Sequence, residues 1–296
     1  MWSHGLKPGE ILMRILVVTS LRDPAGVNIH RRLTELYGFE QTSKNPEGLP
    51  LYELENLSLT STNRSIIMAS HVESWLKVDL IVYASRHSSV AGKPCLTIHT
   101  PGNLTDKVEM GGRPREVCIA PAVAMKTTLI ELYEAAKDKN LLERYDVCLE
   151  CTHHGDYLKG TPCFFIEIGS GREEWMDSKA AEALAEAVVL TSKRIETALR
   201  AGFRVALGVG GPHYNARLTS VMLETDVAVG HIIPKYALSE IDGKMMARVV
   251  ERTLPRPEFA LLDWKGLARE KRRIVSILDE MGLDWKKIRD VKRGED

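Results

Sequence analysis

Five of the nine histidines lie at the ends of short apolar runs that are typical of buried strands. These residues are His87, His99, His153, His154 and His213. Open α/β sheets bind ligands at the edge where the carboxyl ends of their strands meet. Histidine is the side chain best suited to proton transfer or metal ligation near neutral pH. The placement of these five residues therefore predicts one functional site at a sheet edge.

Two carboxylates are candidates for the same site. Glu150 and Glu167 each fall in an otherwise apolar run, and a buried carboxylate needs a partner. Two or three histidines with one carboxylate can hold zinc and leave a position open for water. Such a water is acidified toward neutrality and can attack an ester or an amide. His153 and His154 can face one site only if the chain has already left the strand, which Gly155 allows. A metal-assisted hydrolase is the first hypothesis.

Metal-free acid–base catalysis is the second hypothesis. One histidine would act as the base, Asn103 would orient that histidine or the substrate, and loop amides would stabilise the oxyanion. A structural role stays open for each histidine, because a strand-end histidine can equally be a hydrogen-bonded core or capping residue. Gly210 and Gly211 likewise either allow a ligand to approach the backbone or form only a tight turn.

Three further polar residues lie in or beside these motifs. Arg86 could bind a phosphate or pair with a buried carboxylate. Lys235 could also bind a phosphate, or it could remain solvated in a loop. His231 belongs to the segment 230–236, which we expect to be a loop.

The elements that must position these residues alternate between strands and helices, which indicates an α/β fold with a mainly parallel or mixed sheet. Strands are expected at residues 15–19, 51–59, 66–69, 80–84, 147–150, 163–168, 205–209 and 259–262. Helices are expected at residues 28–37, 71–75, 120–140, 173–201, 217–224, 244–252 and 267–281. Residues 102–115, rich in Gly, Pro and charge, indicate a boundary or an active-site loop. We therefore expect a flexible extension at 1–12, an N-terminal α/β subdomain at 13–110, a C-terminal α/β core at 111–296 and fraying over residues 285–296.

The composition limits the function classes. Forty Lys and Arg balance forty Asp and Glu, so the total charge gives no sign of a nucleic-acid partner, although a local basic patch can hide in a neutral total. No apolar run approaches the ~20 residues of a membrane helix, and residues 1–12 do not resemble a secretion signal. The five cysteines are expected to be reduced, as in the cytoplasm. Cys148 and Cys151 are expected to be buried rather than to bind zinc.

Seven segments together resemble the archaeal and plant type of D-aminoacyl-tRNA deacylase. They are Thr19–Ala25, Ser85–His87, His99–Asn103, Thr152–Gly155, Phe165–Gly169 with Glu174 and Trp175, Gly210–Tyr214 and Gly230–Tyr236. Each motif is weak alone, but their order and completeness make the match specific over nearly the whole chain. The resemblance implies a phosphorylase/peptidyl-tRNA-hydrolase-like α/β core with a mixed sheet and an extra N-terminal α/β subdomain. It also implies a hydrolase that splits the ester between a D-amino acid and the terminal ribose of tRNA, which keeps D-residues out of translation.

The resemblance further implies zinc as the cofactor and the acceptor end of tRNA as the partner. The expected zinc ligands are His99, His153, His154 and Glu167. On the strand-end argument, the expected catalytic residues are His87, His99, His153, His154, Glu167 and His213. The expected tRNA-binding residues are Arg86, Asn103, Gly210, Gly211, His231 and Lys235. A zinc aminopeptidase-like or phosphorylase-like enzyme acting on a small molecule is the alternative. The oligomeric state stays open, with a monomer as one option.

Overall fold

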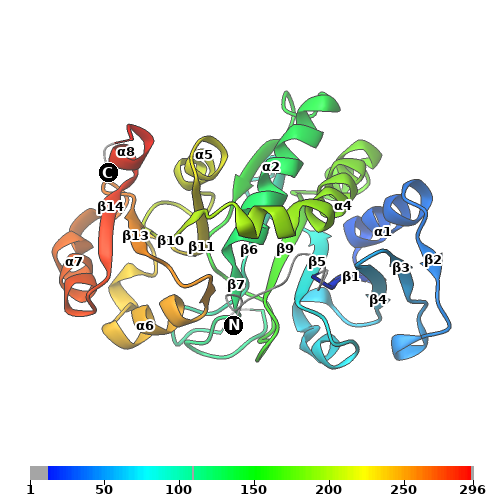
Figure 1. Cartoon of the computed structure of the whole chain (residues 1–296), viewed down its shortest axis with the longest axis horizontal. Coiled ribbons are helices and arrows are strands. Elements are labelled where there is room, and N and C mark those ends of the chain that lie inside the picture. The colour runs from blue at the N-terminus through cyan, green and yellow to red at the C-terminus, as the bar shows by residue number, and fades with distance from the viewer. Residues whose placement is uncertain (1–12, 109, 295–296) are drawn as a thin grey trace.

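The computed structural model describes residues 13–108 and 110–294 and has two main β-sheets with helices packed against them (Figure 1). The eight-stranded sheet comprises, in spatial order, β2 (Glu40–Gln41), β3 (Tyr52–Leu54), β4 (Leu57–Thr62), β1 (Ile15–Ser20), β5 (Leu80–Arg86), β9 (Cys163–Gly169), β6 (Cys95–His99) and β8 (Asp146–Leu149). The four-stranded parallel sheet comprises β11 (Val227–Ile233), β10 (Arg204–Val209), β13 (Phe259–Leu262) and β14 (Asp284–Lys287). A two-stranded sheet pairs β7 (Ala120–Pro121) with β12 (Thr253–Leu254). The mixed α/β class is confirmed.

The direction of β9 decides how the larger sheet presents its strand ends. β9 runs parallel to β5 but antiparallel to β6, and β8 runs parallel to β6. The chain therefore leaves β5 and β6 at opposite edges of the sheet. The expectation that the histidines after these strands share one carboxyl edge is wrong, because β6 and β8 run antiparallel to β5.

Helices cover one face of the larger sheet. The α-helices packed against the two main sheets are α1 (Pro24–Leu36), α2 (Ala122–Asp138), α3 (Arg172–Trp175), α4 (Ser178–Arg200), α5 (Ala216–Glu224), α6 (Gly243–Glu251), α7 (Lys271–Glu280) and α8 (Ile288–Lys292). The central helices α2 and α4 pack against each other, and α1 packs against α4 and β5 (Figure 1). Alternation along β9 sends Phe164, Ile166 and Ile168 into the core shared with these helices. Phe165 and Glu167 must therefore face the opposite side of the sheet.

Tertiary packing overrides the sequence pattern at several elements. The expected loop at 230–236 begins as the end of the buried strand β11, and the expected strand at 66–69 is a short 3-10 helix (Ile66–Met68). The expected helix at 173–201 is split, because the Asp177 side chain accepts the backbone N–H groups of Lys179 and Ala180 and starts α4 anew. The expected strand at 51–59 is the antiparallel pair β3 and β4.

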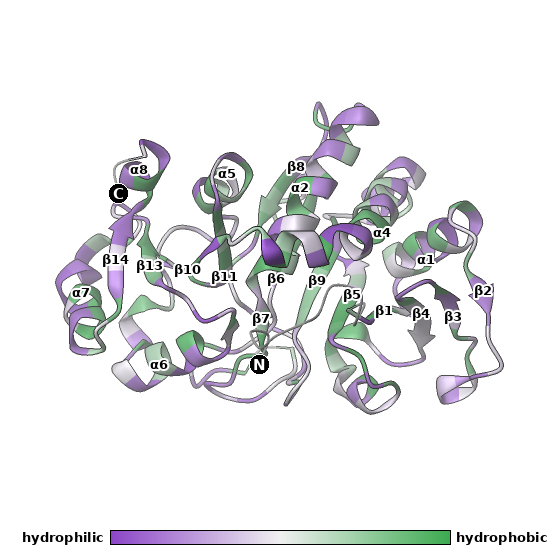
Figure 2. Cartoon of the chain, in the orientation of Figure 1, coloured by the Kyte–Doolittle hydropathy of each residue, from purple (hydrophilic) through white to green (hydrophobic). Residues whose placement is uncertain are grey.

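Residues 285–294 are part of the folded structure and do not form the frayed end that we expected. β14 extends the smaller sheet beside β13, and α8 follows it. Ile288 and Val291 of α8 are buried in the main apolar core, which holds this end in place. Figure 2 shows green apolar ribbon mainly in central strands such as β5, β9 and β11, whereas the outer strands β2 and β14 are largely purple.

The proposed division at residue 110 crosses the larger sheet. β9, from the second part of the chain, lies between β5 and β6, from the first part. The division stays a prediction, and the expected extension at 1–12 lies outside the described residues. Among the described helices, none is long and apolar enough to cross a membrane.

Candidate active site

Glu167 is the centre of the histidine cluster. Its Oε2 atom lies 3.5 Å from Nδ1 of His87 and 3.5 Å from Nε2 of His99. Its Oε1 atom accepts a hydrogen bond of 2.6 Å from the Ser85 hydroxyl. Only 2% of the Glu167 surface is exposed. β9 thus places a buried carboxylate on the sheet face that the main helices leave uncovered, between two imidazoles and a hydroxyl group.

Glu150, one residue after β8, contacts three histidines. Its Oε2 atom lies 2.7 Å from Nε2 of His213 and 3.4 Å from Nε2 of His153. Its Oε1 atom lies 3.3 Å from Nδ1 of His87, so His87 bridges the two buried carboxylates. The two sheets meet here, because His213 follows β10 of the smaller sheet and Glu150 follows β8 of the larger one.

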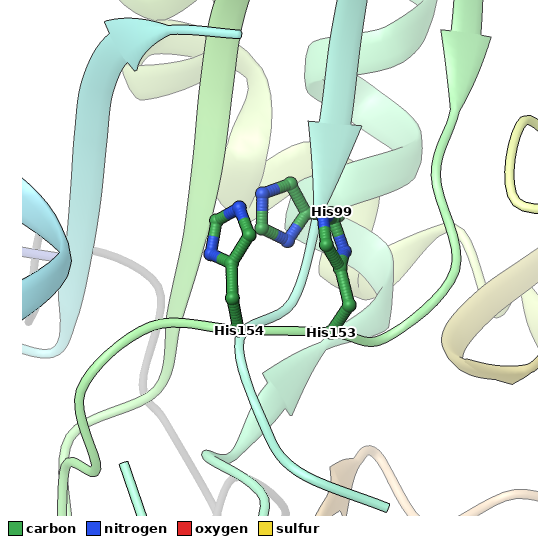
Figure 3. Close-up of side chains that lie close together, drawn as sticks. All are labelled: His99, His153 and His154. Atoms are coloured by element: carbon green, nitrogen blue, oxygen red, sulfur yellow. The ribbon is translucent and has the colours of Figure 1, made fainter. Parts of the chain in front are cut away.

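His99, His153 and His154 gather at one point, where the imidazole rings turn toward one another (Figure 3). One ring nitrogen from each of them lies within 4.8 Å of the others. The centroid of the His153 ring lies 4.2 Å from that of His99 and 4.1 Å from that of His154. His99 also stacks on Phe165, with the two rings nearly parallel. Because β8 ends at Leu149, His153 and His154 lie on loop backbone and can face the same point.

The surroundings divide the histidines into two protonation classes. Burial, reinforced by the nearby His99, lowers the pKa of His153 well below its usual value and that of His154 to about 4. Burial also opposes the charge on His213, but contacts with Cys151 and Glu150 raise its pKa to about 10. His87 follows the same pattern, since Glu167 and Glu150 outweigh burial and raise its pKa. His153 and His154 are therefore neutral near pH 7, and their ring lone pairs are available to a metal ion.

Both carboxylates remain ionised in this environment. Burial would raise the pKa of Glu150, but the hydrogen bond with His213 holds it at about 2. Burial likewise opposes the charge on Glu167, and its contacts with His87 and His99 lower its pKa below the usual value. The cluster therefore combines two carboxylates, two readily protonated histidines and two neutral ones.

Several buried polar atoms of the cluster lack hydrogen-bond partners. Among the described residues they include both ring nitrogens of His99, Nδ1 of His154, Oε1 of Glu150 and Oε2 of Glu167. An unsatisfied buried polar atom is rare in folded proteins and calls for an explanation such as an ion or a water. Imidazole nitrogens and carboxylate oxygens are zinc ligands. The donor set around His99, His153 and His154 therefore fits a divalent cation.

A cavity of about 1010 Å³ opens over this cluster. His87, His153, His154, Glu167 and His213 lie in its lining, while His99 lies fully buried behind them. The cavity walls also carry the cations Arg22, Arg86 and Lys107, together with the carboxylates Asp23 and Glu240. The cavity is thus large enough for more than an amino acid and has positive side chains on its walls.

The structure separates the residues expected to bind tRNA. Arg86 lines the cavity, and its guanidinium group lies over the Trp175 ring. Asn103 also lines the cavity, but its amide donates to the carbonyls of Gly111 and Arg113, so it organises the 102–115 loop. Residues 210 and 211 have backbone φ angles of 96° and 89°, in the left-handed region that favours glycine. Gly211 and Lys235 border a neighbouring cavity instead.

His231 was expected to lie in a loop and to bind tRNA, and the structure places it in a strand instead. It is fully buried in β11, where Nδ1 lies 3.0 Å from the Thr152 hydroxyl and Nε2 lies 3.0 Å from the Cys118 carbonyl oxygen. An RNA chain cannot reach a side chain with no exposed surface. The expectation failed because the segment Gly230–Tyr236 was taken as a loop, whereas its first four residues complete a buried strand.

Sequence reasoning overlooked three residues of the site. The Tyr214 hydroxyl lies 2.5 Å from Nε2 of His87. Cys151 is buried, with Sγ lying 3.4 Å from Nδ1 of His213 and 3.2 Å from the Tyr236 hydroxyl. Tyr214 and Tyr236 each belonged to a quoted motif, so their position beside a histidine or lysine was the available signal. The five cysteines are free and buried, as expected.

Comparisons with the sequences of known proteins point to one family. A profile described as "D-aminoacyl-tRNA deacylase" matches residues 75–286. The curated D-aminoacyl-tRNA deacylase of Pyrococcus furiosus is 36% identical over 277 residues, which cover 91% of this chain and 98% of that protein. The one of Methanocaldococcus jannaschii is 32% identical over 93% of this chain and all of that protein. A crystal structure described as a conserved protein of unknown function, AF0625, superposes with a TM-score of 0.85 at 31% identity, covering 95% of this chain and 97% of that one.

Proposed function

The chain belongs to the D-aminoacyl-tRNA deacylase family, and from this premise we propose that the histidine cluster hydrolyses the ester of D-aminoacyl-tRNA. The products are free D-amino acid and tRNA, and the reaction keeps D-residues out of translation. The proposal rests on Glu167. This carboxylate is buried and ionised, contacts both His87 and His99, and lines an open cavity. A phosphorylase-like or aminopeptidase-like enzyme is not favoured, because the family match spans most of the chain.

The reaction requires a water nucleophile, a base for its proton and an acid for the leaving ribose oxygen. Glu167 is ionised and lines the cavity, so it can orient a water and accept its proton. The hydroxyl of Tyr214 lies 2.5 Å from Nε2 of His87, and Tyr214 also lines the cavity. Tyr214 can donate a proton to the ribose oxygen while His87 replaces that proton. The acyl–oxygen bond breaks, the acyl carbon gains the hydroxyl of water, and the ribose oxygen gains a proton.

Zinc is the proposed cofactor, held by His99, His153 and His154 with Glu167 as a further ligand. The unpartnered nitrogens of His99 and the neutral state of His153 and His154 support this choice. When bound there, zinc would supply Lewis-acid chemistry, acidifying a water or polarising the ester carbonyl. His213 lies outside this set, and its contact with Glu150 fixes the orientation of both side chains.

The test is release of labelled tyrosine from D-tyrosyl-tRNA and from L-tyrosyl-tRNA, each with and without a chelator. We expect rapid release from the D-ester, slow release from the L-ester, and loss of the D-activity on chelation. Absence of release from both esters with zinc supplied would overturn the deacylase function. Release from the D-ester that withstands thorough chelation would retain the function and remove zinc from it.

Three broader expectations accompany the function. The partner is tRNA, recognised at its aminoacylated acceptor end by the cavity that Arg86 lines. The proposed location is the cytoplasm, where aminoacyl-tRNA is made and used, and cell fractionation tests this. The oligomeric state stays open, with a monomer as one option, and light scattering of the purified chain measures it.

A further inference from the structure

We propose that a second cavity beside the active site binds the nucleotides that precede the terminal adenosine, with the Tyr236 ring between the two cavities. This inference rests on the proposed deacylase function. The second cavity has a volume of about 550 Å³, and its lining includes Gly211, Lys235, Leu267 and Arg269. Tyr236 lines this cavity and the active-site cavity alike. A strand whose terminal ester lies at Glu167 can therefore pass over Tyr236 into the second cavity.

The Tyr236 ring is placed so that a nucleic-acid base can stack on it. Its surface is 61% exposed, although it is a large aromatic side chain. Its hydroxyl is directed inward and lies 3.2 Å from Sγ of Cys151, which in turn contacts His213. The phenol is thus anchored at the histidine cluster while much of the ring stays accessible. Single-stranded nucleic acids bind to such rings by stacking a base on the aromatic face.

The charge of the second cavity suits a phosphate backbone. Its described lining contains the cations Lys235 and Arg269 and the carboxylate Glu270. Glu270 pairs with Arg269 at 3.3 Å and also accepts a hydrogen bond of 2.8 Å from Arg273, so two arginines share this one carboxylate. The backbone N–H of Lys235 donates to the Gly211 carbonyl, which fixes the start of this side chain at the cavity wall. Neutralisation of a phosphate by such cations supplies affinity that does not depend on the base.

The active-site cavity would hold the terminal nucleotide of the same RNA strand. Its cations Arg22, Arg86 and Lys107 are available to the terminal nucleotide, while Lys235 and Arg269 lie in the neighbouring cavity. The ligand of the second cavity is accordingly the single-stranded C-C segment that precedes the terminal adenosine of every tRNA. Binding of the C-C segment in the second cavity predicts that the enzyme prefers a CCA trinucleotide ester to an adenosine ester.

The experiment compares D-tyrosyl esters of adenosine, of the CCA trinucleotide and of whole tRNA. The readout is the ratio of kcat/KM for the trinucleotide ester to kcat/KM for the adenosine ester. The variants are Lys235→Gln, Tyr236→Ala and Tyr236→Phe, with Lys244→Gln as the control, because Lys244 is an exposed lysine in α6 outside both cavities. Binding of unacylated CCA oligonucleotide, measured by fluorescence anisotropy at several salt concentrations, provides a second readout.

We expect the wild-type enzyme to prefer the trinucleotide ester. Tyr236→Ala should reduce that preference about tenfold, the scale of one lost stacking contact, whereas Tyr236→Phe should retain most of it. Lys235→Gln should reduce it about fivefold and flatten the salt dependence of CCA binding, and Lys244→Gln should match the wild type. Equal use of the two esters by the wild type, or an unchanged preference in both Tyr236→Ala and Lys235→Gln, would overturn the inference. Failure of the deacylase function itself would be distinct, because the wild type would then release no tyrosine from D-tyrosyl-tRNA.

Discussion

The Nε2 atom of His99 lies 3.5 Å from the Oε2 atom of Glu167, although these residues belong to strands that run antiparallel. The register pairs His99 with Phe165 and Thr97 with Glu167, so the two side chains lie diagonally on the same face of the sheet. The site is therefore built on a sheet face by facing side chains. This arrangement explains how a buried carboxylate can reach histidines that leave the sheet at different edges.

His154→Ala should abolish deacylation without unfolding the protein. His154 is neutral near pH 7 and belongs to the set of three imidazoles that could hold a cation. We expect turnover of D-tyrosyl-tRNA to fall at least about a hundredfold, in line with loss of one essential site group, with a melting temperature close to that of the wild type. His30→Ala is the control, because His30 contacts Thr19 and Ser61 on the N-terminal strands. Wild-type turnover by His154→Ala would remove this residue from the mechanism.

Glu167→Gln should lower kcat at least about a hundredfold and also lower the zinc content of the purified protein. The amide keeps the shape of the side chain but removes the negative charge that His87 and His99 share. Glu131→Gln is the matched control, since Glu131 is equally buried but pairs with Arg194 on the helical side. Elemental analysis and steady-state kinetics measure the two effects. Full zinc content together with full activity in Glu167→Gln would contradict both proposed roles.

Tyr214→Phe should reduce kcat about tenfold to a hundredfold with little change in KM. The substitution removes the hydroxyl that lies 2.5 Å from His87 while it keeps the ring in the cavity wall. Steady-state kinetics with D-tyrosyl-tRNA measure the effect, and Tyr133→Phe on α2 serves as the control. A variant with wild-type kcat would show that the ribose oxygen receives its proton from another source.

Arg86→Gln should weaken tRNA binding more than it slows the chemical step. Arg86 is exposed on the cavity wall, and its side chain lies over the Trp175 ring. We expect KM for D-tyrosyl-tRNA to rise about threefold to tenfold, with a shallower salt dependence from the loss of one phosphate contact. Arg256→Gln, an exposed arginine outside the two cavities, is the comparison. An unchanged KM and salt slope in Arg86→Gln would place the RNA backbone elsewhere.

His231 should make folding stability depend on pH below neutrality. Burial lowers the pKa of His231 to about 3 in the folded chain, whereas the unfolded chain binds the proton at the usual pKa of about 6.5. The unfolded state therefore takes up the proton first as pH falls, and this contribution to stability is present above pH 6.5 and lost toward pH 3. Its slope should be about 1.4 kcal/mol per pH unit between roughly pH 6 and pH 4. Urea unfolding of the wild type and of His231→Gln measures it; equal slopes would contradict the assignment.

The sequence by itself determined the chemistry that the protein brings together. Short apolar runs identified most strands, and the polar residues that interrupt or follow them included the histidines and both buried carboxylates of the cluster. Gly155 allowed His153 and His154 to share a site, and the structure confirms that both lie in a loop. These features are local, because they depend on the alternation of side chains along a strand and on the backbone freedom of glycine.

Only the tertiary structure decided where these groups meet. Because β9 pairs antiparallel with β6, the site lies on a face of the sheet and not at the expected edge. This pairing joins segments almost 70 residues apart in the sequence. The same long-range packing buried His231 in β11 and brought Tyr214 to His87. Strand direction and order depend on the burial of whole faces against helices, which single runs of sequence do not encode. The local sequence thus determined which groups react, whereas the distances between these groups, their burial and their protonation depended on the folded chain.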